Sequence, residues 1–286
     1  MEKLKIISLG MGVQSTALWY MSNHGLMDKA DYAIFADTGA EKTATMKYYN
    51  WLVERYSKYL PVDHYQDWNT PIIRIHDKNI YSDLMAQSNS SGNRFASIPA
   101  FTNKGGGMLR RQCTSEYKIS QVDKSIKRLY GLTKHQRFPK TEIWYGITQD
   151  EMHRMSIPQQ KWKINVYPFI GYKITADGKS ERYSDAFYRR SDIVEYYKEI
   201  KWPLPVKSSC FFCPYQNDES WMFLKNVYPG DFSRAVEVDR RIRNSSKRGI
   251  KEPIFLHRKC EPLENIDFDN TQGNLFNDEC SGNCMI

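Results

Sequence analysis

The sequence predicts an α/β fold with a five-stranded, mostly parallel sheet, helices on both of its faces, and a helical extension that carries cysteines. Three observations favour this class. Short apolar runs alternate with longer amphipathic stretches up to residue 170, a glycine-broken turn links the first run directly to a helix, and the alternation stops at about residue 171. Strand–helix–strand units at this spacing form right-handed crossovers and parallel sheets.

Five apolar runs are expected to form the strands of this sheet. They are residues 5–9, 31–39, 70–75, the first part of 141–154, and 162–170. Three helices are expected between them, at 13–25, 43–60 and 114–131, the last of which is capped by Thr114 or Ser115. Residues 87–107 are rich in Ser, Asn and Gly, so we expect a mobile loop or lid there.

The second part of the chain has a different character. Helices are expected at 189–202, where Pro203 ends the helix, and at 217–228 and 230–249. The tail, residues 270–286, has little periodicity. We therefore expect two domains, 1–170 and 171–286.

Composition bounds the location and the partners of the chain. The 286 residues are enough for a full core, and 41% hydrophobic with 26% charged residues is ordinary for a soluble protein. No apolar run approaches the roughly 20 residues that cross a bilayer, and the N-terminus, acidic at Glu2, is too short for a secretion signal. We expect a cytoplasmic protein with no membrane partner.

The formal charge of +8 favours polyanionic partners such as nucleotides or nucleic acid, although an unspecific basic surface has the same charge. One predicted helix, 230–249, and the residues after it form a strongly basic stretch. Its basic residues are Arg234, Arg240, Arg241, Arg243, Lys247, Arg248 and Lys251. Such a face is usually only solvated, but with 19 tyrosines in the chain a nucleic-acid contact is the alternative.

The turn after the first strand, SLGMGVQST at residues 8–16, suits a phosphate. Glycines let the backbone approach an anion closely, and the N-terminus of a helix presents unpaired N–H groups. The hydroxyls of Ser15 and Thr16 add two donors. The residues expected to bind phosphate here are Ser8, Gly10, Gly12, Gln14, Ser15 and Thr16. A tight turn without a ligand is the alternative.

Three phosphate loops compete for this turn. A Walker loop is excluded, because no lysine lies between Lys5 and Lys29. A dinucleotide-binding loop would use Asp37 as its acidic residue, but Ser15 stands where its third glycine belongs. The turn also resembles the loop of the ATP-pyrophosphatase superfamily, usually Ser-Gly-Gly-x-Asp-Ser-Thr. Gly12, Ser15 and Thr16 match this pattern, whereas Gly10, Met11 and Gln14 replace its Ser, Gly and Asp.

The turn after the second strand favours the third loop. Asp37-Thr38-Gly39 resembles the Asp-Thr-Gly of the phosphoadenosine phosphosulfate reductases, a family within that superfamily. Loops at the carboxyl ends of adjacent parallel strands share one crevice, so Asp37 is expected to face Ser15 across a nucleotide. Its carboxylate would suit a ribose hydroxyl or Mg²⁺. The alternative is an Asx-turn, in which Asp37 binds its own backbone.

Three further segments resemble the same family, in the same order. They are residues 110–127, with Cys113 followed by Lys118; residues 145–155, with Gly146, Asp150, Glu151 and Arg154; and residues 189–205. The resemblance spans about residues 4 to 215. It implies an adenine nucleotide alpha hydrolase-like fold, a nucleotide-binding domain at 1–170, and ATP or phosphoadenosine phosphosulfate with Mg²⁺. Lys118, Arg111 and Arg154 are candidates to neutralise phosphate, or else are solvated surface charges.

The six cysteines predict a metal centre. Cys210 and Cys213 form a C-x-x-C pair, which suits two ligands of one metal or a redox dithiol. Cys113 lies at a predicted helix start, where a thiolate is favoured. Iron–sulfur sulfonucleotide reductases pair a Cys-Cys with a distant C-x-x-C; here Gln112 replaces one ligand, so a fourth would come from Cys284, Cys280 or Cys260. The resemblance favours a 4Fe–4S cluster, and zinc is its rival.

Cys280 has a second possible role. Glu279-Cys280 resembles the Glu-Cys-Gly ending of the reductases, whose cysteine is the nucleophile, although Ser281 replaces the glycine. Cys280 is therefore a candidate nucleophile or ligand, unless the tail is only a disordered segment with incidental thiols.

Three functions follow from these expectations. The first is an ATP-dependent enzyme that adenylates a substrate, releases pyrophosphate and transfers sulfur from a donor protein, with a nucleotide or nucleic acid as acceptor and with Ser15 and Asp37 as catalytic residues. The second is a sulfonucleotide reductase with Cys280 as nucleophile. The third is a non-catalytic nucleotide- or nucleic-acid-binding module, for which Gln14 in place of Asp is the best support.

Overall fold

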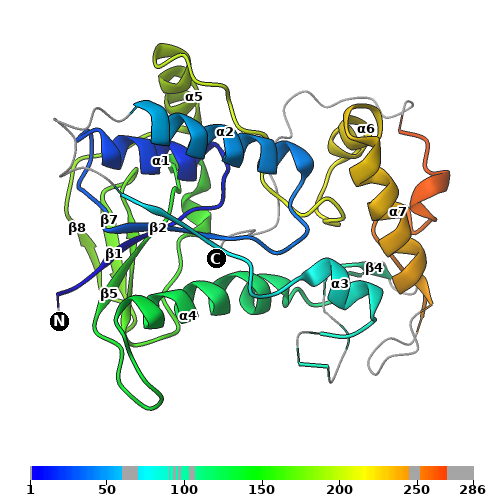
Figure 1. The fold of residues 1–286 in the computed structure, drawn as a ribbon, viewed down its shortest axis with the longest axis horizontal. Helices are drawn as coiled ribbons and strands as arrows, with labels where there is room; N and C mark the ends of the chain where they lie inside the picture. Colours follow the sequence, from blue (N-terminus) through cyan, green and yellow to red (C-terminus); the bar gives the residue numbers. More distant parts are fainter. Residues whose placement is uncertain are drawn as a thin grey trace.

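A seven-stranded sheet forms the centre of the molecule (Figure 1). The computed structural model describes residues 2–59, 70–89, 91–92, 95, 98–102, 107–244 and 252–268. The strands lie in the order β3-β2-β1-β5-β6-β7-β8. Their bounds are β1 Lys5–Ser8, β2 Tyr32–Ala36, β3 Ile72–Ile75, β5 Thr141–Trp144, β6 Lys163–Tyr167, β7 Tyr172–Thr175 and β8 Ser180–Arg182.

The expected five strands are the five parallel members of this sheet. β3, β2, β1, β5 and β6 pair with one another in parallel. The expectation of five strands was nevertheless too low, because β7 and β8 extend the sheet as an antiparallel hairpin. The strand order reverses between β1 and β5, and in open α/β sheets such a reversal marks a crevice at the carboxyl ends of the strands.

The hairpin lacks the apolar runs by which the other strands are recognised. The residues of β7 are half-buried and those of β8 are exposed. Their turn contains Asp177, which accepts hydrogen bonds from the Thr175 hydroxyl and the Lys179 backbone, and Gly178, which has a positive φ of 83°. Turn chemistry and backbone pairing therefore define this hairpin, rather than burial.

Helices cover both faces of the sheet (Figure 1). One face carries α1 (Val13–Asn23), α2 (Thr43–Tyr59) and α5 (Arg190–Glu199), whose buried side chains include Trp19, Leu52 and Tyr197. On the other face, a π-helical segment, η2 (Thr114–Ile119), continues into α4 (Ser120–Leu129). Val122 and Ile126 of α4 pack there against strand residues such as Ile34.

A second apolar core lies beside the sheet and joins distant parts of the chain. It contains Phe211, Phe212 and Trp221 from the second half and Ile80 and Leu84 from the first half. The elements that surround it are α3 (Ile80–Met85), β4 (Phe101–Thr102), α6 (Asp218–Val227), α7 (Pro229–Arg243), β9 (Ile254–Phe255) and η4 (Leu263–Asn265). β4 pairs with β9. Packing therefore crosses residue 170, since β7 and β8 also belong to the sheet.

Part of the segment expected to be a mobile loop, 87–107, is ordered. Ile98 and Ala100 are buried in the second core, and β4 follows them. Residues 90, 93–94, 96–97 and 103–106 of this segment lie outside the described residues.

Hydrogen bonds hold the arginines of α7 within the fold. Arg234 pairs with Asp231 at 2.6 Å, and Arg240 with Glu264 at 3.1 Å. The Arg241 Nε donates to the Met85 carbonyl at 2.7 Å. In a further contact, Arg243 pairs with Asp239 at 2.5 Å. Arg240 and Arg241 thus link α7 to η4 and to the end of α3, whereas Arg234 and Arg243 pair with residues of α7 itself. Lys247, Arg248 and Lys251 lie outside the described residues.

Within the described part of the chain, none of the helices combines the length and the apolar character that crossing a lipid bilayer requires.

A buried ionic cluster ties β9 to α6. The His257 Nε2 donates to Asp218 Oδ1 at 2.9 Å, and Arg258 donates to the other carboxylate oxygen at 2.8 Å. His257 is 1% exposed and Asp218 is 5% exposed. Burial lowers the pKa of His257 despite the neighbouring carboxylate. Burial acts to raise the pKa of Asp218, but the hydrogen bonds from His257 and Arg258 outweigh it, so this pKa lies below its ordinary value.

The free energy of unfolding is expected to fall in two stages as the pH is lowered from neutrality. Below the ordinary His pKa of 6.5, the unfolded chain protonates before His257 does in the folded state, which favours unfolding. The contribution of Asp218 is present above its ordinary pKa of 3.8 and is lost at lower pH. Denaturant unfolding at a series of pH values measures both stages.

The His257→Gln variant provides the control for this prediction. It removes the first stage and keeps the second, because Arg258 still pairs with Asp218. An identical loss of stability between neutral pH and pH 5 in the parent and the variant would show that His257 does not cause the first stage.

Candidate functional site

The Ser15 side chain forms hydrogen bonds across the loop between β1 and α1. The Ser15 hydroxyl accepts a hydrogen bond from the Gly10 N–H at 3.2 Å and donates to the Gly12 carbonyl at 3.3 Å. Met11 has a positive φ of 58°, a left-handed conformation that favours glycine. The Met11 side chain is nevertheless fully buried.

Beside this loop lies a cavity of about 60 Å³, here called the loop hollow. Its lining includes Gly12, Gln14, Ser15, Gly146, Glu151 and Arg154. Glu151 accepts hydrogen bonds from Gln14 at 3.1 Å and from Arg154 at 2.5 Å. The Arg154 Nε is buried and has no partner among the described residues. An unsatisfied guanidinium N–H beside a phosphate-type loop fits an anion.

Gly146 holds β5 close to the loop. A Cβ at this position would lie 2.7 Å from the Ser15 backbone nitrogen and 2.8 Å from the Gln14 carbonyl carbon. Real side chains do not make such short contacts with backbone atoms, so the position requires glycine. Gly146 therefore fixes the wall of the loop hollow, a role that the sequence motif did not specify.

Asp37 lies at the end of β2 and uses both of its carboxylate oxygens. Oδ1 accepts from the Gly39 N–H at 2.8 Å, which is the Asx-turn considered as the alternative for this residue. Oδ2 accepts from Arg74 at 2.5 and 2.9 Å, and His76 lies at 3.3 Å. Asp37 is 5% exposed. The sequence analysis missed Arg74, although it is the charged residue in the otherwise apolar third strand.

Thr38 and Gly39 connect this turn to other segments. The Thr38 hydroxyl donates to Glu41 Oε1 at 3.1 Å and lies 3.5 Å from the Cys210 sulfur. Gly39 has a positive φ of 74°, and a Cβ there would lie 2.5 Å from the Asn79 side chain. Both residues therefore shape the turn against its neighbours.

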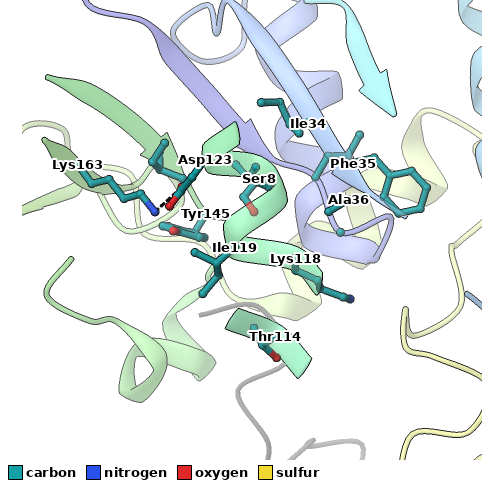
Figure 2. Close-up of a pocket in the computed structure, with 14 residues that line it drawn as sticks. Ser8, Ile34, Phe35, Ala36, Thr114, Lys118, Ile119, Asp123, Tyr145 and Lys163 are labelled. Carbon is teal, nitrogen blue, oxygen red and sulfur yellow. Dashed lines mark ion pairs between the residues drawn. The ribbon is translucent and has the colours of Figure 1, made fainter. Parts of the chain in front are cut away.

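A central hollow lies between the carboxyl ends of β1, β2 and β5 and the start of the η2–α4 helix (Figure 2). Ser8, Ile34, Ala36 and Tyr145 line it from the sheet. Figure 2 shows Lys118 toward one end of this hollow and the Asp123–Lys163 pair toward the other. The pair is joined at 2.6 Å. Burial raises the pKa of Asp123, although Lys163 opposes this effect.

Cys113, Cys210 and Cys213 line one cavity of about 50 Å³, here called the cysteine hollow. Arg111 and Lys118 also line it. The Arg111 guanidinium lies 5.7 Å from the ring centre of Tyr215, and its Nη1 is buried without a partner among the described residues. The three cysteines thus line the same cavity.

The C-x-x-C segment is fixed against the turn after β2. The Phe211 N–H donates to the Ala40 carbonyl at 2.9 Å, and Glu41 pairs with Cys210 as an antiparallel bridge. Burial is the main effect that raises the pKa of Cys210 to about 12, and the carboxylate of Glu41 adds to it. A bound metal would reverse this effect, because metal ligation deprotonates a thiol.

The other cysteines differ in their placement. The Cys260 sulfur lies 3.7 Å from the Thr102 carbonyl, at the β4–β9 pair, and does not line the cysteine hollow. Cys280 and Cys284, the proposed nucleophile and ligand, lie outside the described residues.

The donor set of the cysteine hollow fits a thiolate-bound metal in its chemistry, because three soft ligands share one cavity. Within the described residues, however, no three His, Cys, Asp or Glu side chains are close enough together to hold a metal ion. In this conformation Cys113, Cys210 and Cys213 line one cavity but do not form a coordination sphere.

Two residues missed by the sequence analysis lie beside these thiols. Glu41 is 6% exposed, and its Oε2 is buried without a partner among the described residues. Lys42 is 5% exposed. Burial lowers the pKa of Lys42, while Cys213 acts in the opposite direction. The signal in the sequence was the pair of adjacent charges that follows Ala40, one residue after the Asp37-Thr38-Gly39 turn.

Comparisons of the chain with protein-family models, with curated proteins and with solved structures found no match.

Replacing Gly146 by alanine is expected to displace the loop and to lower the free energy of unfolding by about 1–3 kcal/mol. The cause is the contact of 2.7 Å between the new Cβ and the Ser15 nitrogen. Chemical denaturation measures the change.

Gly230→Ala is the matched control, because a Cβ at Gly230 meets nothing within 4 Å. That position lies in the first turn of α7, so alanine there should leave stability unchanged or raise it by up to about 1 kcal/mol. Equal stability of the two variants would contradict the assigned role of Gly146.

Proposed function

We propose that this protein is an ATP-dependent enzyme of the pyrophosphatase-loop kind. It adenylates an oxygen atom of a nucleotide or nucleic-acid acceptor, releases pyrophosphate, and replaces the activated oxygen by sulfur. The supporting observation is the continuity of the three hollows. Ser8 and Tyr145 line both the loop hollow and the central hollow. Thr114 and Lys118 line both the central hollow and the cysteine hollow.

This arrangement suits a nucleotide with its reacting end toward the thiols. Ile34, Ala36 and Ile119 line the central hollow, which has a volume of about 30 Å³, so in this proposal the hollow widens when a purine ring binds against them. The loop hollow supplies the Arg154 guanidinium as a donor for phosphate, and the Ser15 hydroxyl becomes a second donor when it exchanges its hydrogen bond to the Gly12 carbonyl. Lys118, between the central and cysteine hollows, supplies a positive charge where an acceptor would meet the nucleotide.

The proposed chemistry has two displacements. The acceptor oxygen attacks the α-phosphorus of ATP, the bond to the β-phosphate breaks, and pyrophosphate leaves. A sulfur nucleophile at the oxidation level of a thiol then forms a bond to the acceptor carbon, and AMP leaves with the oxygen. The first step gains most from donors that are fixed before charge develops on the leaving group, which is the role proposed for Ser15 and Arg154.

The carboxylates near the loop already have partners. Glu151 is bound by Gln14 and Arg154, and Asp37 by Arg74 and the Gly39 N–H. Mg²⁺ is commonly held by substrate phosphates, water and one or two carboxylates, so in this proposal it arrives with ATP. The Asp37 carboxylate shapes the turn and faces Arg74, and its proposed catalytic role requires exchange of that ion pair.

A metal at the thiols would supply a site for holding or activating sulfur. Cys113, Cys210 and Cys213 are the residues proposed to hold it, with Cys280 or Cys284 as a fourth ligand. A 4Fe–4S cluster and zinc remain the two candidates, because thiolate ligands suit both.

One observation favours a second candidate, a sulfonucleotide reductase. Asp37 is fully engaged by Arg74 and Gly39, as would suit a site that positions a nucleotide without metal-assisted pyrophosphate release. In that reaction the Cys280 thiolate would attack the sulfur of phosphoadenosine phosphosulfate, break its bond to the phosphate oxygen and release phosphoadenosine phosphate, which leaves an S-sulfocysteine. A thioredoxin-type dithiol would then displace sulfite, restore the Cys280 thiol and be oxidised to a disulfide.

The Arg154→Gln variant tests the first function. With ATP, Mg²⁺ and bulk RNA or mixed nucleotides as acceptors, the parent should release pyrophosphate, and the variant should be slower on the order of 100-fold, because it loses a fixed donor to the leaving group. Arg128→Gln is the control, since Arg128 is exposed and pairs with Asp77. Sulfite release from phosphoadenosine phosphosulfate without pyrophosphate release from ATP would favour the reductase.

Metal analysis tests the centre separately. Protein purified without oxygen is expected to contain iron and acid-labile sulfide, and Cys213→Ser should lose most of both. Cys260→Ser, whose thiol lies at the Thr102 carbonyl, should keep them. Zinc in place of iron, with the same dependence on Cys213, would identify the rival metal, and equal loss in both variants would contradict the assigned ligands.

A further inference from the structure

Lys42 is a largely buried cation that forms no salt bridge within the described residues. It lies between the turn after β2 and the first residue of α2, and only 5% of it is exposed. Its ammonium group makes no hydrogen bond or salt bridge to any residue that the structure describes. Burial of most of this side chain disfavours its charge, and an anion close to the ammonium would offset that effect.

The charged and titratable groups around Lys42 indicate which anion could lie close to its ammonium. Its electrostatic neighbours are Cys213, Lys207, Glu41 and Cys210. Lys207 is a second cation and increases the cost. Glu41 is directed elsewhere, since its Oε1 accepts from Thr38 and lies 3.9 Å from the Lys118 ammonium. Among the neighbours that favour the charged form of Lys42, the Cys213 thiol has the largest effect, and Glu41 and Cys210 act in the same direction.

Backbone pairing fixes this arrangement. Ala40 and Glu41 pair with Phe211 and Cys210, so Lys42, the next residue, stays beside the cysteine segment. On the other side of that segment, the Ser208 side chain lies 3.9 Å from where a Cβ of Gly12 would be. Lys42 therefore lies beside the cysteine segment, and that segment also lies close to the loop between β1 and α1 through Ser208.

We propose that Lys42 compensates the charge of a thiolate–metal centre formed by Cys210 and Cys213. The inference rests on the proposed function insofar as that function places a metal at these thiols. A centre with three or four thiolates keeps a net negative charge after it binds Zn²⁺ or an iron–sulfur cluster. An enclosed ammonium beside it stabilises the thiolate form, as partners outside the coordination sphere do in other metal sites. Lys42 acts through the ligands and is a positioning residue.

Zinc binding by the metal-free protein tests this inference. Affinity for Zn²⁺ alone is measured anaerobically by competition with a chromogenic chelator, and Co²⁺ absorption reports thiolate ligation. Lys42→Met should weaken Zn²⁺ binding about 10- to 100-fold. The same variant without metal should unfold at the same or a higher denaturant concentration, because it loses an unpaired buried charge.

Two controls separate the possible failures. Lys47→Met removes an exposed lysine from α2, the helix that directly follows Lys42, and should bind Zn²⁺ as the parent does. Cys213→Ser should lose tight binding; if it binds as the parent does, the proposed metal site fails and this inference fails with it. If binding depends on Cys213 but Lys42→Met binds normally, only the role of Lys42 is overturned. Lys42→Gln, which also removes the charge, serves if the methionine variant does not fold.

Discussion

The pairing of the turn after β2 with the C-x-x-C segment is the contact on which the candidate site depends. The Phe211 N–H donates to the Ala40 carbonyl, and Glu41 bridges to Cys210. Phe211 and Phe212 then enter the second apolar core, which holds the segment in place. This contact brings a late part of the chain to the carboxyl edge of the parallel strands, where it shares a cavity with Cys113. Without it, the three thiols would belong to separate parts of the molecule.

Buried charged groups at the two ends of the parallel strands differ in whether they have partners within the fold. At the opposite end of β5, the buried Glu142 pairs with Lys3 at 2.6 Å and with Lys173 at 3.1 Å. These contacts satisfy the carboxylate within the fold, and they outweigh the effect of burial so that its pKa is lowered. At the carboxyl edge, Glu41, Arg111 and Arg154 each retain a buried polar atom without a partner among the described residues. Buried polar atoms without partners also occur elsewhere, for example at Trp221 and Tyr48, but Arg111 and Arg154 line hollows in which a ligand could supply the missing partner.

The apolar pattern of the sequence was sufficient for the parallel strands and the long helices, because each of them buries a continuous face. It missed the β7–β8 hairpin, whose residues are half-buried or exposed and whose pairing is made by the backbone. The motif around Asp37 located a turn at the right edge but not its ion pair with Arg74, which depends on the register between β2 and β3. The importance of Glu41 and Lys42 arises from a contact between distant segments, which no local pattern encodes.

The β7–β8 hairpin, which the sequence analysis did not predict, forms one edge of the sheet. A strand at the border of a sheet exposes unpaired N–H and C=O groups, which can pair with a strand of another molecule. Here the border strand β8 is short, fully exposed and charged, with Glu181 and Arg182 within it and Lys179 just before it. Charged side chains on so short a strand make a poor template for strand addition. The polarity of β8 thus protects the molecule against edge-to-edge aggregation on that side.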